Sequence, residues 1–122
     1  MTHDDATRWL NGYIDAWRSY DPEAIGALFA EDAEYRYHPW DEPLRGRDAI
    51  VEDWRVNRDE PGTWDAEYAP WAVEGSRVVA TGTSRYRAVD GQPARTFHNV
   101  FLVELDDSGR ATSFTEVFAE ER

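Results

Sequence analysis

The sequence contains no cysteine, no cluster of basic residues and no long apolar run, and each absence excludes a class of protein. Without cysteine the chain forms no disulfide, thiolate nucleophile, zinc ribbon or iron–sulfur cluster. No stretch of about 18 apolar residues is available to span a membrane. The N-terminal segment MTHDDATRW is polar and acidic, unlike a signal peptide. We therefore expect a cytoplasmic protein.

The balance of charge is strongly acidic. The chain of 122 residues carries 25 acidic and 13 basic residues, which gives a formal net charge of −12. A surface of this sign repels nucleic acid and anionic membranes, so neither is an expected partner. The length suits a single domain over residues 1–122, and a chain of this size buries enough surface for one core without disulfides or metal.

Common catalytic and ligand-binding motifs are missing as well. The sequence has no G-x-S-x-G, G-x-G-x-x-G, P-loop or H-E-x-x-H motif. Its histidines, at positions 3, 38 and 98, lack the spacing of a metal-ligand set, and the acidic runs lack the alternating oxygens of an EF-hand. We expect neither a metal nor a cofactor.

The first half of the chain has helical periodicity. The segment DDATRWLNGYIDAWRSY places one apolar stripe on a helix, formed by Trp9, Leu10, Tyr13, Ile14 and Trp17. Asp21 followed by Pro22 predicts the start of a second helix, whose buried face we expect to contain Ile25, Leu28 and Phe29. GRDAIVEDWRV predicts a third helix with Trp54 on its apolar side, and a short strand is expected over residues 34–38.

The second half changes to a period of two, which is typical of strands. Strands are predicted over residues 64–74, 77–87, 94–105 and 110–118, with tight turns between them. Helices followed by a run of antiparallel strands predict an α+β fold. We expect three N-terminal helices packed on one face of a strongly curved, mainly antiparallel sheet.

Strand alternation places two polar side chains among aromatic ones. Phe114, Glu116 and Phe118 share one face of the last predicted strand. If this face is the core, Glu116 lies in low dielectric and its pKa rises, which suits a general acid or base. In the neighbouring strand Asn99 shares a face with Phe101 and is a candidate donor to a ligand carbonyl. The alternative for both is a polar group satisfied within the core.

The segment EYRYHPWDEP concentrates aromatic rings and carboxylates between residues 34 and 43. Along a strand Tyr35 and Tyr37 point to one face and His38 to the other, and Trp40 follows in a loop. We expect Tyr35 or Tyr37 to line a cavity and residues 38–41 to form its rim. A crowded structural corner, with Trp40 packed on a proline, is the alternative.

The order of these elements, with DPEAIGALFAEDAEY, LRGRDAI and NVFLVELDDSGRATSFTEVF, resembles the SnoaL-like branch of the nuclear transport factor 2-like superfamily. The resemblance covers nearly the whole chain. It implies a cone-shaped α+β barrel with an apolar cavity between helices and sheet. It also implies a homodimer joined through the outer sheet face, where alternation places His98, Val100 and Leu102. Because the superfamily contains isomerases, cyclases, dehydratases, epoxide hydrolases and proteins without known chemistry, fold does not define the reaction.

The resemblance to ketosteroid isomerase implies roles for three residues. Tyr37 matches the position of the catalytic base, Tyr13 matches an oxyanion-binding tyrosine, and Asn99 matches the second oxyanion donor. A tyrosine is a poor base at neutral pH, whereas a histidine such as His38 titrates near ~6.5. Acid–base chemistry would therefore use Glu116 with help from Tyr37 or His38. The Arg/Asp set of the epoxide hydrolases is not identifiable.

Two functions agree with these patterns. One is a cofactor-independent isomerase, cyclase, lyase or hydrolase acting on a small apolar carbonyl or ring compound, with Glu116, His38 and Tyr37 as its catalytic residues. The other is a non-catalytic module that binds a small apolar molecule or only dimerises. The residues expected to contact the ligand are Tyr13, Trp17, Tyr35, Trp40, Trp54, Asn99, Phe101, Phe114 and Phe118.

Overall fold

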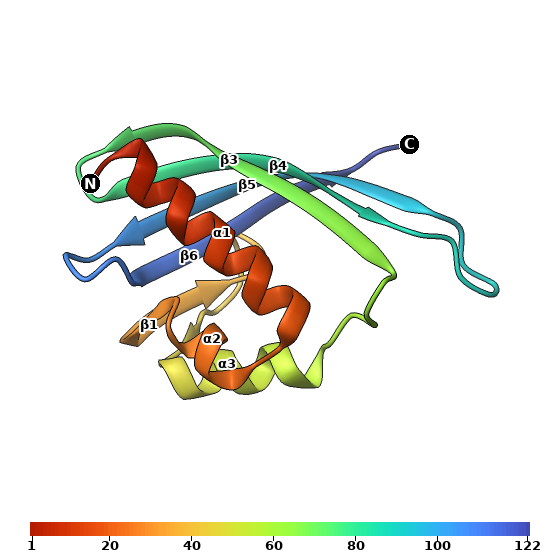
Figure 1. Cartoon of the computed structure of the whole chain (residues 1–122), viewed down its shortest axis with the longest axis horizontal. Coiled ribbons are helices and arrows are strands. Elements are labelled where there is room, and N and C mark those ends of the chain that lie inside the picture. The colour runs from red at the N-terminus through yellow and green to blue at the C-terminus, as the bar shows by residue number, and fades with distance from the viewer.

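The computed structural model describes all residues from 1 to 122 and contains three helices and one six-stranded sheet (Figure 1). This confirms the predicted α+β class with N-terminal helices on a mainly antiparallel sheet. In chain order the elements are α1 (His3–Ser19), α2 (Pro22–Gly26), β1 (Phe29–Arg36), β2 (Leu44–Arg45), α3 (Arg47–Val56), β3 (Trp64–Glu74), β4 (Arg77–Tyr86), β5 (Arg95–Leu105) and β6 (Ala111–Glu120).

The sheet joins the two halves of the chain. Its strand order is β2-β1-β6-β5-β4-β3, and every pair is antiparallel except β1 with β6. In that parallel pair Tyr35 lies opposite Phe114. The last strand is therefore flanked by β1 on one side and β5 on the other. This arrangement brings the aromatic segment that begins at residue 34 next to the strand that carries Glu116.

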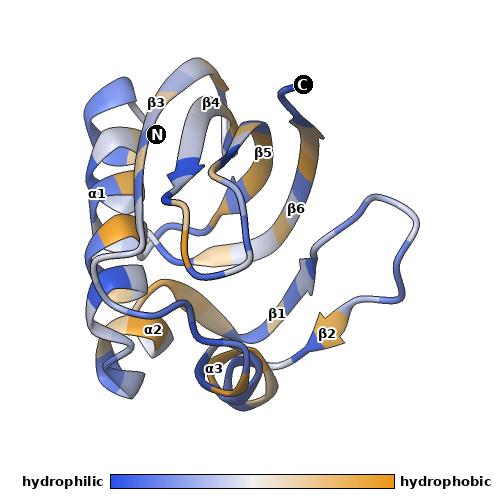
Figure 2. Cartoon of the chain, turned by 90° about the vertical axis from the view of Figure 1, so that its right-hand side faces the viewer, coloured by the Kyte–Doolittle hydropathy of each residue, from blue (hydrophilic) through white to orange (hydrophobic).

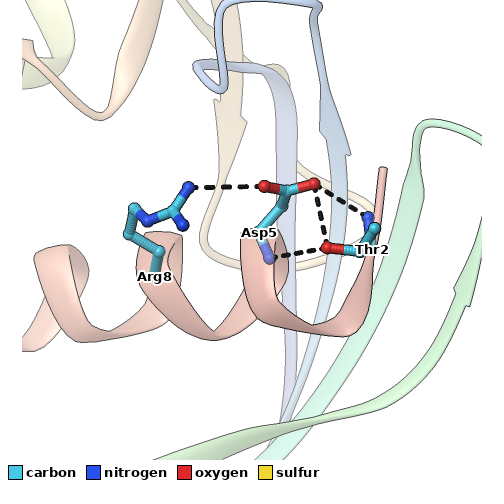
Figure 3. A network of polar contacts seen from close by, with 3 residues as sticks. All are labelled: Thr2, Asp5 and Arg8. Atoms are coloured by element: carbon cyan, nitrogen blue, oxygen red, sulfur yellow. Dashed lines mark hydrogen bonds and ion pairs between the residues drawn. The ribbon is translucent and has the colours of Figure 1, made fainter.

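Helix α1 begins at a capping box (Figure 3). The Asp5 N–H donates to Thr2 Oγ1 at 3.1 Å, and the Thr2 N–H donates in return to Asp5 Oδ2 at 3.0 Å. Arg8 pairs with the same carboxylate at 3.3 Å. These bonds satisfy amide groups that have no partner inside the helix. From this fixed start one side of α1 faces the sheet and is buried, namely Ala6, Trp9, Leu10, Tyr13, Ala16 and Trp17.

The region around Phe29 differs from the prediction. Ile25, Leu28 and Phe29 are all buried, but α2 ends at Gly26 and Phe29 is the first residue of β1. The reason is tertiary: Phe29 is in register with Ala111 of β6, and the Ala111 N–H donates to the Leu28 carbonyl at 2.8 Å. The strand predicted over residues 34–38 therefore begins at residue 29, and it ends at Arg36, before Pro39.

The core lies between α1 and the inner face of the sheet. Aromatic rings from four elements, α1, β1, β5 and β6, meet there. Tyr13 of α1 lies 5.1 Å from Phe101 and 5.7 Å from Phe114 between ring centroids, and Tyr35 stacks on Phe114 at 4.6 Å. Figure 2 shows apolar and polar segments alternating along α1, as expected for a helix that is covered on one side. None of the three helices combines the length and the apolar character that a membrane-spanning helix requires.

Candidate functional site

A cavity of about 130 Å³ lies between the helices and the sheet. Its volume is close to the roughly 150 Å³ of a cavity that admits one benzene molecule. Every aromatic residue in its wall is a tyrosine or a tryptophan, so each ring also carries an O–H or N–H group. The lining residues are Tyr13, Trp17, Tyr20, Tyr35, Tyr37, Trp54, Asn57, Asp59, Tyr68, Ser84, Tyr86 and Glu116.

The phenylalanines expected in the cavity wall lie elsewhere. Phe101 and Phe114 are fully buried behind the wall, where they pack against Tyr13. Phe118 is 42% exposed and Trp40 is 80% exposed, and neither lines the cavity. Phe118 lies in the part of β6 that runs beyond the helices, where residues 117–120 are all exposed. The lining is thus amphipathic rather than apolar, because the purely apolar rings fill the core.

Glu116 of β6 reaches the cavity, as strand alternation predicted. It lies opposite Phe101 in the sheet. Burial raises the pKa of Glu116 to about 7, and only the positive charge of His38 opposes this shift. Burial disfavours the carboxylate because the low-dielectric wall replaces water around it. Near neutral pH the group is therefore populated in both protonation states, as a general acid or base requires.

Tyr37 has its hydroxyl group committed to another residue. Its O–H donates to Oδ2 of Asp53 on α3 at 2.5 Å. Burial and this hydrogen bond raise the pKa of Tyr37 above its ordinary value, so the side chain stays protonated. Tyr37 therefore lines the cavity but does not serve as a base. Asp53 was not predicted as a partner of the cavity residues. The only feature of the sequence that could have indicated it is its position next to Trp54 on the third helix.

His38, expected at the rim of the cavity with residues 39–41, is not among the residues that line it. Because β1 ends at Arg36, the His38 side chain is not held on the outer face of a strand. Its ring stacks on Trp40 at 4.9 Å and lies 5.5 Å from the ring of Phe118. Its Nδ1 is 2.9 Å from Oδ2 of Asp41. The connection from β1 to β2, which carries this cluster, projects from the sheet (Figure 2).

Asn99 is buried but does not line the cavity. Its amide nitrogen donates to the hydroxyl oxygens of Tyr68 at 2.9 Å and Ser84 at 3.0 Å. Both amide hydrogens are thus used within the protein, which corrects the expectation that Asn99 donates to a ligand. Its observed effect is to hold Tyr68 and Ser84, which do line the cavity. Asn99 is thus a polar group satisfied within the core, which is the alternative left open by the sequence, and it positions the Tyr68 and Ser84 side chains.

Tyr68 depends on a glycine in the neighbouring strand. Gly82 lies opposite Tyr68 on one side and opposite Asn99 on the other. A Cβ atom at position 82 would lie 2.3 Å from Cδ1 of Tyr68 and 2.1 Å from the carbonyl oxygen of Glu67. No side chain fits at such distances. Gly82 therefore allows the Tyr68 ring to lie across β4 at the cavity.

The loop between α3 and β3 contributes Asn57 and Asp59 to the wall. Trp17 Nε1 donates to Oδ2 of Asp59 at 2.9 Å, and the Asp59 N–H donates to the Tyr20 hydroxyl at 2.8 Å. These bonds hold the loop against α1. Trp17 was predicted from helical spacing. Asp59 was not, because an acidic loop residue in this sequence has no periodic pattern that distinguishes it.

Tyr13, Tyr35 and Trp54 come together from three elements, α1, β1 and α3. The ring of Trp54 lies 5.2 Å from that of Tyr13 and 6.4 Å from that of Tyr35. Burial raises the pKa of Tyr13 and of Tyr35 well above the ordinary value, so both hydroxyls remain protonated donors.

No arginine lines the cavity, and the structure contains no group of three or more His, Asp or Glu side chains arranged to hold a metal.

The fold is that of the nuclear transport factor 2-like proteins. Residues 10–114 match the family model described as SnoaL-like domain, so the chain belongs to the SnoaL-like family. The predicted family is thereby confirmed. A search of the curated proteins found no match.

Two solved structures show the same fold. An LEH-like epoxide hydrolase from M. tuberculosis superposes with a TM-score of 0.70 at 20% sequence identity, covering 96% of this chain and 84% of the other. An NTF-2 like protein of unknown function from Burkholderia xenovorans LB400 gives a TM-score of 0.71 at 18% identity, covering 98% of this chain and 86% of the other. At this level of identity the likeness concerns the fold alone.

Proposed function

We propose that the chain binds a small molecule in the cavity and acts on it by acid–base chemistry without a cofactor. The reaction class is isomerisation, cyclisation, dehydration or hydrolysis of a small carbonyl or ring compound, with Glu116 moving the proton. The observation that supports this proposal most strongly is a carboxyl group buried in a cavity wall, with its pKa raised into the neutral range.

The surroundings of Glu116 suit proton transfer next to a carbonyl group. A carboxylate with a pKa near the working pH removes a proton efficiently, and nearby donors stabilise the negative charge that develops on the carbonyl oxygen. Tyr13 and Tyr35 are such donors, and the negative charge of Glu116 contributes to the rise in the pKa of both, which places the three groups in one electrostatic environment. The volume of the cavity limits the bound part of the substrate to about one ring.

The same carboxyl group also suits the opening of a small epoxide, the substrate class of the M. tuberculosis neighbour. In that reaction the protonated form of Glu116 would donate its proton to the ring oxygen while a water molecule attacks a ring carbon, so that one C–O bond breaks, another forms and a diol results. The positive charge of His38 lowers the pKa of Glu116 and so favours its carboxylate form, in opposition to burial.

A titration of Glu116 tests the proposal. In a sample with carbon-13 in the glutamate side chains, the carboxyl signal of Glu116 should titrate near pH 7, and comparison with the Glu116→Gln variant identifies that signal. The raised value follows from burial, so it requires the folded cavity. A midpoint near the ordinary ~4.3 of a solvated glutamate would refute the acid–base role.

A second candidate function is ligand binding without catalysis. It is favoured by Tyr37, which the resemblance to ketosteroid isomerase matches to the catalytic base and whose hydroxyl donates to Asp53. In this case small cyclic ketones would raise the melting temperature and be recovered unchanged after long incubation. If the native protein converts a bound ketone and the Glu116→Gln variant does not, the protein is an enzyme and not only a binding module.

We further propose a homodimer formed through the outer face of the sheet. Val100 and Val117 are directly paired across β5 and β6, and Leu102 lies on the same face. Leu102 is 45% exposed and Val117 is 40% exposed. His98, at the edge of this apolar row, is exposed and lies 2.7 Å from Glu121. Such a row on a strand face is typical of a surface that is covered in an assembly.

A further inference from the structure

The wall of the cavity carries two acidic side chains and no basic one. Of its 12 residues, Asp59 and Glu116 are acidic, and none is arginine, lysine or histidine. Asp59 accepts a hydrogen bond from Trp17 at 2.9 Å. Burial and the charge of His38 are the only influences on the pKa of Glu116, so no hydrogen bond within the protein satisfies this carboxyl group. The wall therefore offers negative charge to a ligand.

The rest of the wall is mainly aromatic, since eight of the 12 residues are tyrosine or tryptophan. Core rings hold two of these from behind. Tyr35 stacks on Phe114 with 4.6 Å between ring centroids, and Tyr68 stacks on Phe101 at 4.4 Å. The face of an aromatic ring carries partial negative charge and attracts a cation that lies within about 6 Å of the ring centroid. Rings and acidic groups therefore favour the same sign of ligand charge.

The positive charges of the protein lie outside this wall. Cζ of Arg58 is 5.2 Å from the centroid of the Tyr20 ring, so one wall residue already contacts a cation of the chain. Arg58 is nevertheless exposed and does not line the cavity. His38, whose charge acts on Glu116, does not line it either. Within the cavity the two acidic groups therefore have no positive partner.

Tyr86 of β4 is under the influence of both acidic groups. Burial is the main cause of its raised pKa, and the charges of Asp59 and Glu116 both add to the rise. Its ring packs edge to face against Phe97, with 5.7 Å between the centroids. A cation next to the Tyr86 ring would be attracted by the ring and by two carboxylates. The attraction is stronger beside a low-dielectric wall than in bulk water.

We propose that the cavity binds a small organic cation, with an alkylated ammonium group against the ring of Tyr86 and with Asp59 and Glu116 as its counter-ions. Such a group suits an aromatic wall because it presents apolar methyl groups together with positive charge. A neutral ligand of the same shape would leave both carboxylates desolvated without compensation. This inference rests on the proposed function in that the cavity binds a ligand, and it assigns that ligand to the class of ammonium compounds.

Choline and 3,3-dimethylbutan-1-ol are the probes that test the proposal. The two molecules have the same shape, and a neutral carbon in the alcohol replaces the charged nitrogen of choline. The titration is carried out at pH 8, where Glu116, with a pKa of about 7, is mainly a carboxylate. Isothermal titration calorimetry should show that choline binds at least about tenfold more tightly than the alcohol.

Neutral variants of the two acidic residues test the counter-ions. Glu116→Gln and Asp59→Asn should each weaken choline binding at least about threefold, because an attractive charge pair is lost, and should change binding of the alcohol much less. Asparagine at position 59 keeps an oxygen that can accept the Trp17 hydrogen bond. Glu60→Gln is the matched control, since Glu60 is the exposed neighbour of Asp59 and does not line the cavity. This control should bind choline like the native protein.

The contribution of the ring is tested at Tyr86 with two aromatic replacements. Tyr86→Phe keeps an electron-rich ring and should keep most of the preference for choline. Tyr86→4-cyanophenylalanine introduces an electron-poor ring of similar size and should weaken choline binding about threefold or more, with little change for the alcohol. Circular dichroism confirms that both variants are folded. Equal choline affinity in the two folded variants would refute the contact with this ring.

Three further results would overturn the inference: equal affinity of the native protein for the two probes, no binding of either probe, or an equal loss of choline binding in Glu60→Gln and Asp59→Asn. The last result would mean that the net charge of −12 attracts choline without a specific site. The proposed function fails separately. If Glu116 titrates near ~4.3 while choline is preferred, the acid–base role fails and the cation site stands. A raised Glu116 pKa without a preference for choline gives the opposite outcome.

Discussion

At the scale of single residues, Glu116 has the most direct consequence for stability. Burial raises its pKa from the usual 4.5 to about 7. A carboxyl group with a higher pKa in the folded chain binds a proton more tightly when folded, so its contribution to stability falls as the pH rises from about 4.5 to about 7 and is constant above that range. A shift of this size corresponds to a loss of about 3 kcal/mol at most.

The variant Glu116→Gln should remove this pH dependence. The amide is neutral at every pH, so the variant and the native protein should have similar stability at pH 4, and the variant should be up to about 3 kcal/mol more stable at pH 8. Urea unfolding at both pH values measures the difference. The same change at the exposed Glu52 of α3 is the control and should leave the pH dependence as in the native protein. Equal pH profiles for Glu116→Gln and the native protein would contradict the prediction.

The residues of the cavity were predictable to the extent that they belong to a regular pattern. Tyr13 and Trp54 lie on helical stripes and Glu116 on a strand face, and all three reach the cavity. Periodicity tells which side of an element is buried, but not whether the buried group meets a void or other side chains. For that reason Phe101 and Asn99, on the same face of β5, were expected in the cavity wall and lie behind it.

At the scale of the elements, β3 and β4 depend on Gly82, because the Tyr68 ring lies where a side chain at position 82 would be. Gly82→Ala should lower the free energy of unfolding by about 1–3 kcal/mol through overpacking and should displace Tyr68 from Asn99. Urea unfolding and the chemical shift of the Tyr68 ring report the two effects.

A matched glycine serves as the control for this prediction. At Gly26, at the end of α2, a Cβ would meet only ordinary contacts, the nearest being Cδ of Arg47 at 3.5 Å. Gly26→Ala should therefore be neutral or slightly stabilising, since alanine restricts the unfolded chain. A Gly82→Ala protein as stable as Gly26→Ala would show that β3 and β4 can separate without cost.

Element boundaries were predictable where local signals act alone. Asp21 caps α2 through its contact with the Glu23 N–H at 3.2 Å, as the sequence indicated, and the predicted range of β3 agrees with the structure. The start of β1 was not predictable, because Glu31 and Asp32 are exposed and interrupt any apolar alternation. Its strand geometry comes from pairing with β6, a partner that local sequence does not reveal.

At the scale of the whole molecule, the proposed dimer makes a prediction about mass. Leu102→Glu places a charge in the exposed apolar row of β5, where its desolvation would oppose association. Light scattering should give about twice the 14.1 kDa chain mass for the native protein and the monomer mass for the variant. Val56→Glu, at an exposed site on α3, should remain dimeric. A native protein of monomer mass at micromolar concentration would exclude this dimer.

The position of β6 between β1 and β5 also determines when the chain can fold on the ribosome. Residues 29–36 are synthesised early, but β6, which pairs along one of their edges, emerges from the exit tunnel after the other five strands. Until then the aromatic rings of α1 and β1 lack the surface that covers them, and nascent chains in this state are prone to aggregate. Synthesis rate and chaperone access should therefore influence the yield of this protein more than its modest size suggests.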